Sequence, residues 1–294
     1  MSVHTGEPTH NSHEDVNWPP ASSLLHRSVL HKRASAEVLV GSARRTESGA
    51  AFTVELPPTH STVLRGSPRV PPVLMLEAVR QLGIATAHYL LSTPLEWAFI
   101  ANAMSLQWLT DPVSFPAFGP VQLEAHVQAV DITARNGAPS GLTAQASLDQ
   151  DGDSVAHAAG KLTFVPPATY RAIRHHAHMP SSRGSRTDFQ HLTNVQQGPA
   201  TLTAQVGWDW RDRFYFDHDA DHVPGMVIAA AACEAQHLLS DGCEARALQM
   251  EFVRYAELDV PIDVAARNTD GLRSPVFVAF SQCSEPIGEA TFAP

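Results

Sequence analysis

Two stretches of the chain carry the apolar pattern of a long buried helix. In the segment 73–91, Leu76, Val79 and Leu82 lie among good helix formers, and few positions in it are polar. The segment 224–239, PGMVIAAAACEAQHLL, has the same character. We therefore expect two helices that are each buried on most of their surface.

Extended segments surround both expected helices. Runs rich in β-branched, aromatic and alternating apolar residues predict strands at 36–42, 50–56, 97–109, 121–130, 141–150, 156–165, 202–210, 248–258, 261–268 and 275–283. Asn-Gly at 136–137 and Asp-Gly at 151–152 predict tight turns between neighbouring strands. Strands joined by such turns are antiparallel.

The order of elements occurs twice, which indicates two related domains. Val-Pro-Pro-Val at 70–73 aligns with Val-Pro-Gly-Met at 223–226, an offset of 223 minus 70, or 153 residues. A repeat of this length indicates duplicated domains rather than a solenoid. We predict a loose tail at 1–22, a first domain at 23–165, a linker rich in Pro, Ser, Arg and His at 166–198, and a second domain at 199–294.

One long helix wrapped by an antiparallel sheet, present twice in tandem, is the α+β architecture of a double hotdog. We expect the two sheets to join edge to edge within the chain, which removes two exposed sheet edges. A chain of 294 residues is long enough to bury two such cores without a metal or disulfide.

Composition excludes several classes of function. The net charge of -10 argues against a nucleic-acid groove, although it leaves room for a small phosphorylated substrate. Three cysteines at no metal-ligand spacing fit free thiols. No apolar run approaches the ~20 residues that span a membrane, and the N-terminus lacks a secretory pattern. We expect a cytoplasmic protein with no metal, no cofactor, no membrane contact and no nucleic-acid partner.

Several motifs, in order along nearly the whole chain, resemble the A-factor type of gamma-butyrolactone signal synthases. They are LLHR (24–27), LEAVRQLGIATAH (76–88), FVPPATYRAIR (164–174), DHVPGM (221–226) and FVRYAELDVP (252–261). The resemblance implies a double hotdog acyltransferase. Such an enzyme moves a beta-ketoacyl group from an acyl carrier protein thioester to dihydroxyacetone phosphate, a small phosphorylated acceptor, and begins a gamma-butyrolactone or butenolide-type signal.

The two halves depart from the family pattern in opposite ways. Where the family has His-Asp-Pro before its first helix, this chain has Val-Pro-Pro at 70–72, and where the family has Glu and Arg in its second helix, it has Ala230 and Cys233. The first helix retains Glu77 and Arg80. Because hotdog active sites lie between two halves, we expect one composite site per chain and an inactive opposite site.

The residues expected at the composite site come from both halves. The catalytic candidates are Glu77, His222 and Arg80. The substrate-binding candidates are Asp221, Gly225, Met226, Gln81 and Arg254. Glu77 or His222 would accept the proton of the attacking hydroxyl, and Arg80 would bind a phosphate or orient Glu77. Backbone N–H groups at Gly225 would polarise the thioester carbonyl.

Simpler interpretations of these residues stay open. Glu77 and Arg80 also fit an intrahelical ion pair, His222 a helix cap, and Arg254 a strand-edge residue. The Asp- and His-rich run at 217–222 resembles metal ligands but has no distant partner cluster, and Cys233 fits a small apolar filler. His60 and His88 match family positions and equally fit core histidines.

Two other functions also remain compatible with the sequence. One is a diverged hotdog dehydratase, isomerase or thioesterase of a natural-product pathway. The other is a non-catalytic hotdog protein that binds a ligand or a carrier. Fold alone does not choose among them, and the sequence leaves open whether the chain forms a homodimer.

Overall fold

The computed structural model describes residues 25–63, 66–177, 190–269 and 274–294. Its helical elements are η1 (Arg27–Leu30), η2 (Ser35–Glu37), α1 (Pro72–Leu91), α2 (Pro167–Ile173) and α3 (Gly225–Leu239). Its strands are β1 (Val40–Thr46), β2 (Gly49–Leu56), β3 (Ala98–Trp108), β4 (Val121–Arg135), β5 (Ala138–Gln150), β6 (Asp153–Val165), β7 (Leu192–Gln197), β8 (Thr201–Val206), β9 (Ala247–Phe252), β10 (Asp263–Asn268), β11 (Val276–Gln282) and β12 (Glu285–Ala293).

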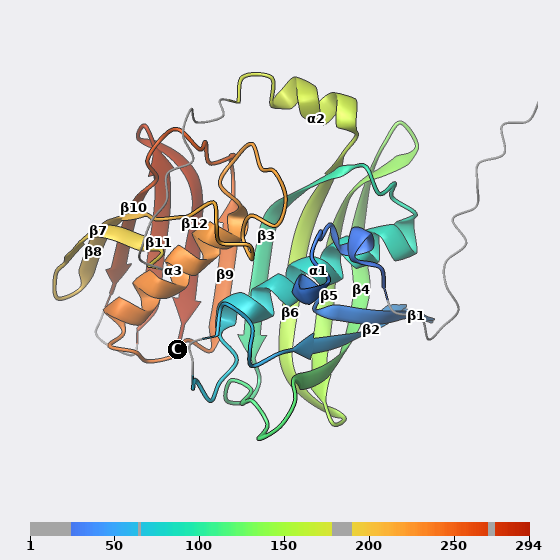
Figure 1. Cartoon of the computed structure of the whole chain (residues 1–294), viewed down its shortest axis with the longest axis horizontal. Helices are drawn as coiled ribbons and strands as arrows, with labels where there is room; N and C mark the ends of the chain where they lie inside the picture. The colour runs from blue at the N-terminus through green and yellow to red at the C-terminus, as the bar shows by residue number, and fades with distance from the viewer. Residues whose placement is uncertain (1–24, 64–65, 178–189, 270–273) are drawn as a thin grey trace, which may run out of the picture.

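The strands of both halves form one antiparallel sheet. Within the described residues it has 12 strands in the order β1-β2-β4-β5-β6-β3-β9-β12-β11-β10-β8-β7 (Figure 1). Strands β3 and β9 join the two halves, with Leu106 paired to Leu248 and Ala103 to Glu251. The expected edge-to-edge junction is therefore present.

Both predicted tight turns connect neighbouring strands of the first half. Asn136 and Gly137 join β4 to β5 with φ of 52° and 78°, and Asp151 and Gly152 join β5 to β6 with φ of 53° and 93°. Asn, Asp and Gly tolerate this left-handed region better than other residues, so these dipeptides set the registers of the two hairpins.

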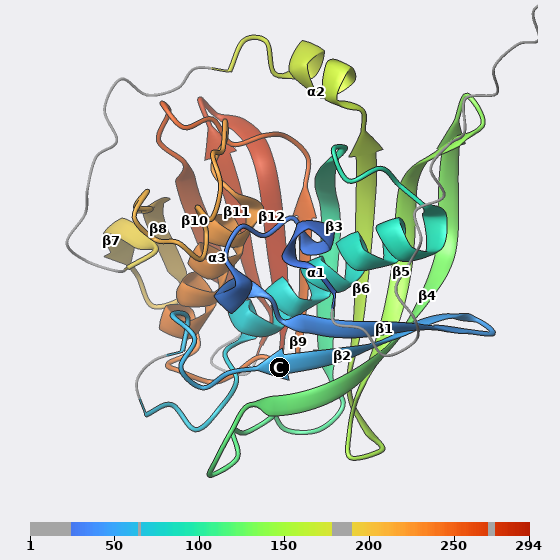
Figure 2. The same cartoon turned by 45° about the vertical axis from the view of Figure 1, so that its right-hand side comes forward.

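Helices α1 and α3 lie on the same side of the sheet and contact each other (Figures 1 and 2). Each is preceded by a proline as its N-cap, Pro71 or Pro224, which ends the extended backbone before the helix. The buried apolar residues of the two halves form one continuous core between helices and sheet. This arrangement is the expected α+β tandem double hotdog.

The sequence repeat corresponds to a structural repeat. Helix α1 begins at Pro72 and α3 at Gly225, which is 225 minus 72, or 153 residues later. Gln81 in α1 accepts a hydrogen bond from the backbone N–H of Leu39 at 2.9 Å. Glu234, 153 positions after Gln81, accepts one from the backbone N–H of His191 at 2.8 Å. The same helical position therefore ties each helix to the segment before its sheet.

Several elements differ from the predicted ranges. Helix α2 and strand β7 lie within 166–198, the predicted linker. Strand β7 is a polar edge strand in which only Leu192 is buried, so it lacks an apolar signal. Strand β12 contains Pro286 and Gly288, which weaken a strand pattern, yet it is paired between β9 and β11. The predicted tail at 1–22 lies outside the described residues.

No helix among the described residues is both long enough and apolar enough to cross a membrane.

Candidate functional site

A single carboxylate, that of Glu77 on α1, is the centre of a buried charged cluster. Glu77 is 1% exposed. Its Oε1 lies 3.0 Å from Lys32 Nζ and accepts a hydrogen bond from Arg80 Nη2 at 2.8 Å, while its Oε2 accepts one from Arg80 Nε at 2.7 Å. Gln81 Nε2 donates to Oε1 at 2.9 Å. We call these four residues, Lys32, Glu77, Arg80 and Gln81, the Glu77 cluster.

Helical spacing and the short η1 segment bring the cluster together. Arg80 and Gln81 follow Glu77 by three and four residues, so all three project from neighbouring positions on α1. Lys32 comes from the turn after η1 and is 6% exposed. Lys32 is not among the residues predicted from the sequence. The nearest signal is the LLHR match at 24–27, which overlaps the start of η1.

The two cations keep Glu77 ionised. Burial alone would raise the pKa of Glu77, but Arg80 and Lys32 outweigh burial and lower it from 4.5 to about 2. A carboxylate with such a low pKa is a weak proton acceptor at neutral pH. The geometry therefore fits Glu77 as the group that positions Lys32 and Arg80.

The loop before α3 reaches this cluster from the second half. Asp217 accepts hydrogen bonds from the backbone N–H groups of Arg33 at 2.5 Å and Ala34 at 3.1 Å, directly after Lys32. Partial burial and the charge of Arg80 lower the pKa of His218, against an opposing effect of Asp217. His218 stays accessible to solvent. The lowered pKa favours the neutral imidazole, and the bonds of Asp217 to Arg33 and Ala34 hold this part of the loop next to Lys32.

Aromatic packing holds the preceding part of this loop against the first half. The ring of Phe214 contacts His60 edge to face at a centroid distance of 4.9 Å. Lys32 Nζ lies 5.4 Å from the centroid of the same ring. His60 in turn lies 3.2 Å from a carboxylate oxygen of Glu37. His60 is therefore a partnered interface histidine.

A second polar cluster surrounds Asp221. Its Oδ1 lies 2.7 Å from His222 Nδ1 and accepts a hydrogen bond from the Tyr170 hydroxyl at 2.9 Å. Arg174 Nε donates to Oδ2 at 3.2 Å, and Arg174 Nη2 donates to the backbone carbonyl of Asp221 at 2.7 Å. Burial opposes ionisation, but the bonds from His222 and Tyr170 hold the pKa of Asp221 far below its usual range.

Arg174 connects this second cluster to the loop after β9. It donates to both carboxylate oxygens of Glu257, at 2.6 and 2.8 Å, and lies 4.4 Å from the ring centroid of Tyr255. The ring of His222 meets Tyr255 edge to face at 4.9 Å. Tyr170 and Arg174 belong to α2 and its C-cap, so the predicted linker supplies structural partners for the 217–222 loop. The FVPPATYRAIR match was the signal for them.

The structure thus separates the predicted site residues into groups. Glu77, Arg80 and Gln81 lie together, whereas the side-chain contacts of His222 within the described residues are to Asp221 and Tyr255. The other histidine of this loop is His218, and burial, Arg80 and Lys32 lower its pKa. Gly225 and Met226 begin α3, with Met226 buried. Arg254 is exposed and pairs with Glu285 at 3.4 Å.

The positions of α3 equivalent to Glu77 and Arg80 are uncharged. Ala230 is buried within α3, and Cys233 occupies the position equivalent to Arg80. Burial raises the pKa of the Cys233 thiol to about 12. Such a thiol forms almost no thiolate at neutral pH and is a poor nucleophile.

We expect that replacing Cys233 with Ala changes the rate of the acyl transfer that the family resemblance implies by less than about twofold, because the thiol supplies almost no nucleophile. Initial rates of the purified variant and of the unchanged protein test this expectation. A loss of tenfold or more at unchanged melting temperature would contradict the expectation of one active site per chain.

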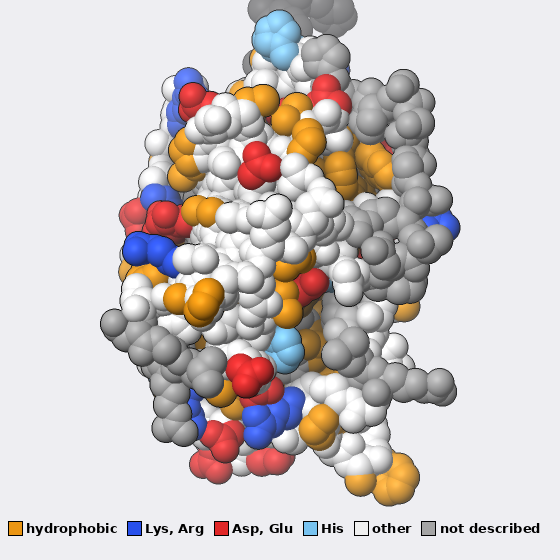
Figure 3. All heavy atoms as spheres, turned by 90° about the vertical axis from the view of Figure 1, so that its left-hand side faces the viewer, with side chains coloured by type: hydrophobic (Ala, Val, Ile, Leu, Met, Phe, Trp, Pro, Cys, Tyr) orange, Lys and Arg blue, Asp and Glu red, His pale blue; other side chains and the backbone are white. Residues whose placement is uncertain are grey.

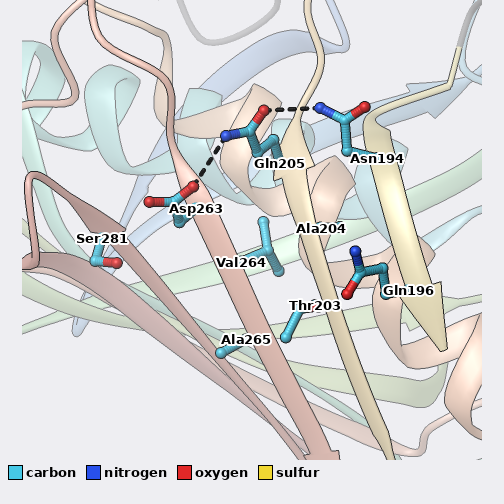
Figure 4. Close-up of a pocket in the computed structure, with 9 residues that line it drawn as sticks. All are labelled: Asn194, Gln196, Thr203, Ala204, Gln205, Asp263, Val264, Ala265 and Ser281. Carbon is cyan, nitrogen blue, oxygen red and sulfur yellow. Dashed lines mark hydrogen bonds between the residues drawn. The ribbon is translucent and has the colours of Figure 1, made fainter. Parts of the chain in front are cut away.

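Two cavities are lined by residues outside both clusters. One, of about 400 Å³, is an open groove on the face of the sheet opposite α3, between β7, β8 and β10 (Figure 4). Asn194, Gln205 and Asp263 form a hydrogen-bonded row along it. The other, of about 360 Å³, is lined by Val38, Glu55, Thr59, Gly119 and the prolines at 57, 58 and 120. Neither has the apolar lining and convergent polar groups typical of an acyl-chain site.

Metal ligands do not cluster in the described part of the chain: it contains no group of three or more His, Cys, Asp or Glu side chains suited to a metal ion. His175 and His176 stack with ring centroids 3.6 Å apart. His178, the third histidine of the predicted linker, lies outside the described residues.

Comparison with known proteins identifies related sequences over most of the chain. The A-factor biosynthesis hotdog domain matches residues 15–166 and 191–293. A 2-oxo-3-(phosphooxy)propyl 3-oxoalkanoate synthase from Streptomyces virginiae is 28% identical over 265 residues, which cover 83% of this chain and 87% of the relative. A protein of the same name from Streptomyces coelicolor is 24% identical, covering 87% and 84%.

Solved structures share the fold at low sequence identity. An acyl-ACP thioesterase from Bacteroides thetaiotaomicron aligns with a TM-score of 0.51 and 11% identity, over 83% of this chain and 96% of that protein. A 12:0-ACP thioesterase from Umbellularia californica aligns with a TM-score of 0.50 and 12% identity, with the same coverage. At this identity the likeness concerns the fold alone.

Proposed function

Because the chain belongs to the A-factor biosynthesis hotdog family, we propose that it transfers a beta-ketoacyl group from a thioester to dihydroxyacetone phosphate. The two Streptomyces relatives are named for the product of such a transfer, a 3-oxoalkanoate ester that carries a phosphooxy group. The chain is accordingly an enzyme of acyltransferase type in gamma-butyrolactone synthesis. We also propose the acyl donor and the residues of the site.

The main support for the location of the site is the pairing of two cations with one carboxylate in the Glu77 cluster. Lys32 and Arg80 share the single charge of Glu77, so the trio bears one net positive charge. A phosphate would find there both a lysine ammonium and the remaining N–H groups of a guanidinium. Arg80 is part-buried rather than enclosed, with 22% of its side chain exposed. It can therefore meet a ligand from solvent.

His218 fits the role of proton acceptor in this proposal. Its lowered pKa leaves it unprotonated at neutral pH, as a general base must be. The hydroxyl oxygen of the acceptor attacks the thioester carbonyl, and its proton passes to His218. The carbon–sulfur bond then breaks, and the proton passes from His218 to the departing thiolate. In this proposal His218 is therefore the general base, the role that the sequence suggested for His222. His222 instead holds the 217–222 loop in place.

For the donor we propose an acyl carrier protein thioester, as the family resemblance implies. Carrier proteins are acidic, so a docking surface would need exposed cations. On the face shown in Figure 3, basic side chains lie beside acidic ones rather than in a patch of one sign. Arg33 and Arg213, by contrast, are exposed and are the chain neighbours of Lys32 and Phe214. They would place the carrier beside the Glu77 cluster.

The proposed reaction is tested by mass spectrometry. The purified protein would receive a beta-ketoacyl thioester with and without dihydroxyacetone phosphate. A phosphorylated ester or its cyclised product, formed only with the acceptor, would support the proposal. Loss of the thioester without the acceptor would place the protein among hydrolases or dehydratases instead.

We expect that replacing Lys32 with Gln raises KM for dihydroxyacetone phosphate by about 10- to 100-fold, because one charge-assisted contact to phosphate is lost. KM for the thioester should stay within about twofold, since the acyl donor does not need this cation. Initial-rate kinetics with each substrate varied in turn measure both constants.

The matched control is Lys161→Gln, which removes an exposed lysine from β6. It should leave both constants unchanged. Equal rises in both constants for Lys32→Gln would contradict a phosphate-binding role and would indicate a general disturbance of the site.

A further inference from the structure

A chain of hydrogen bonds connects two histidines to the carbonyl of Thr93. His88 Nδ1 lies 2.6 Å from the backbone oxygen of Thr93, and His88 Nε2 lies 3.0 Å from His31 Nε2. His88 is fully buried on α1, and His31 follows η1 directly before Lys32. Both rings pack against Phe99, with centroids 5.0 and 4.9 Å from it. The two imidazoles are therefore held in fixed orientations.

The chain of bonds assigns a tautomer to each ring. A carbonyl oxygen only accepts, so His88 Nδ1 carries the hydrogen that it donates to Thr93. Burial lowers the pKa of His88, against the opposing hydrogen bond to Thr93, so the ring is neutral and its Nε2 is an acceptor. His31 Nε2 must then be the donor. Burial, His88 and Arg80 lower the pKa of His31 from 6.5 to about 3, so its Nδ1 is left as a bare acceptor.

His31 is the chain neighbour of Lys32, which belongs to the Glu77 cluster. After burial and His88, the charges of Arg80 and His218 also lower its pKa, and within the described residues it makes one side-chain hydrogen bond, the one through Nε2. Its backbone is left-handed, with φ of 54° and ψ of 37°. His31 is the C-cap of η1, a position at which this conformation is common, and histidine adopts it more readily than most residues. The cap of η1 therefore fixes the backbone from which the His31 ring meets His88.

We propose that His31 is a binding residue for the acceptor substrate, whose hydroxyl donates a hydrogen bond to His31 Nδ1 while the phosphate meets Lys32 and Arg80. This inference rests on the proposed acyl transfer and deepens it. The class of ligand is a small phosphate ester that carries a free hydroxyl. Because the His88–Thr93 chain prevents Nδ1 from becoming a donor, the site discriminates against acceptors in which that hydroxyl is blocked or replaced by an acceptor group.

The tautomers are tested without turnover, by two-bond ¹H–¹⁵N correlation NMR of the ¹⁵N-labelled full chain. We expect hydrogen on Nδ1 of His88 and on Nε2 of His31, with no titration of His31 near its ordinary pKa. Addition of dihydroxyacetone phosphate should shift the Nδ1 resonance of His31 and leave that of His88 in place. A protonated His31 Nδ1, or no shift at a saturating concentration of this probe, would overturn the proposal.

Kinetics give a second and separate test. His31→Ala should raise KM for dihydroxyacetone phosphate by about tenfold with KM for the thioester unchanged, because one hydrogen bond is lost. His31→Asn should recover most of the loss, since its amide oxygen can replace Nδ1, and His157→Ala, which removes an exposed histidine, should have no effect. A rise in KM that Asn does not relieve argues for a structural role. A shift of His31 in a protein without acyl transfer would retain the binding inference and reject the proposed reaction.

Discussion

Replacing Glu77 with Gln is expected to lower the free energy of unfolding by about 3–5 kcal/mol, the usual cost of removing one partner of a buried ion pair. The reason is that Lys32, 6% exposed, and Arg80 would both keep their charge beside a neutral amide. Glutamine has nearly the shape of glutamate, so packing changes little. Urea denaturation at neutral pH measures the difference.

The effect should depend on pH in a defined direction. The pKa of Glu77 is about 2 in the folded protein and 4.5 ordinarily. A lowered pKa means that the stabilisation is complete above the ordinary pKa and is lost as the pH falls through the folded one. The shift corresponds to about 3 kcal/mol. The stability gap between the unchanged protein and Glu77→Gln should therefore be constant above about pH 5 and narrow towards pH 2.

The control is Glu124→Gln, which breaks an ion pair with Arg44 in which both side chains are about half exposed. Exposed pairs contribute about 0–1 kcal/mol, so its effect should be small. If both variants lost the same small amount, Glu77 would not be the centre of a buried charge cluster. The positioning of Lys32 and Arg80 by Glu77 would then be wrong.

Replacing His218 with Asn is expected to lower kcat/KM for acyl transfer by about 10²–10⁴, the usual contribution of a general base. The pKa of His218 is lowered from 6.5 by partial burial and by Arg80. In the unchanged protein kcat/KM should therefore be level at neutral pH and fall only in the acid range, as His218 gains a proton. This acid limb should disappear in the variant.

His222→Asn supplies the comparison, since His222 is on the same loop and bonds to Asp221. We expect it to cost less than about tenfold, as a disturbed loop contact does when no proton transfer is removed. If His222→Asn lowered kcat/KM more than His218→Asn, His222 would be the general base and the assignment to His218 would be wrong. Circular dichroism of both variants excludes misfolding as the cause.

The fold was largely predictable from the pattern of residues. Helix α1 matches the predicted segment at 73–91 almost to its ends, because its apolar residues and its prolines at 71–72 are local signals. The two turns at 136–137 and 151–152 were equally predictable from the sequence, since their φ angles favour Asn, Asp and Gly. Strand β7 was not predictable, because an edge strand with one buried residue lacks an apolar pattern and is stabilised by its hydrogen bonds to β8.

The candidate site was predictable only in part. The proximity of Glu77, Arg80 and Gln81 was predictable, because residues three and four positions apart on a helix are neighbours. The positions of Lys32 and His218 were not, because the contact of Lys32 with Glu77 depends on the η1 turn, and His218 comes from a loop of the other half that bonds to Arg33 and Ala34. The loop 217–222 contains two histidines, and sequence spacing does not tell which one faces α1. The contacts of Asp221 with Tyr170 and Arg174 decide it, since they turn His222 towards Tyr255.

The sequence by itself determined the two helices, most strands, the 153-residue repeat and the family, because each of these depends on local pattern or on residues that can be aligned. Only the tertiary structure decided which groups surround Glu77 and which residue the ring of His31 meets. Both depend on hydrogen bonds and charges between segments far apart in the chain, such as Lys32 with Glu77 and His31 with His88. Interactions of that kind come into being only when the sheet and helices have brought those segments together.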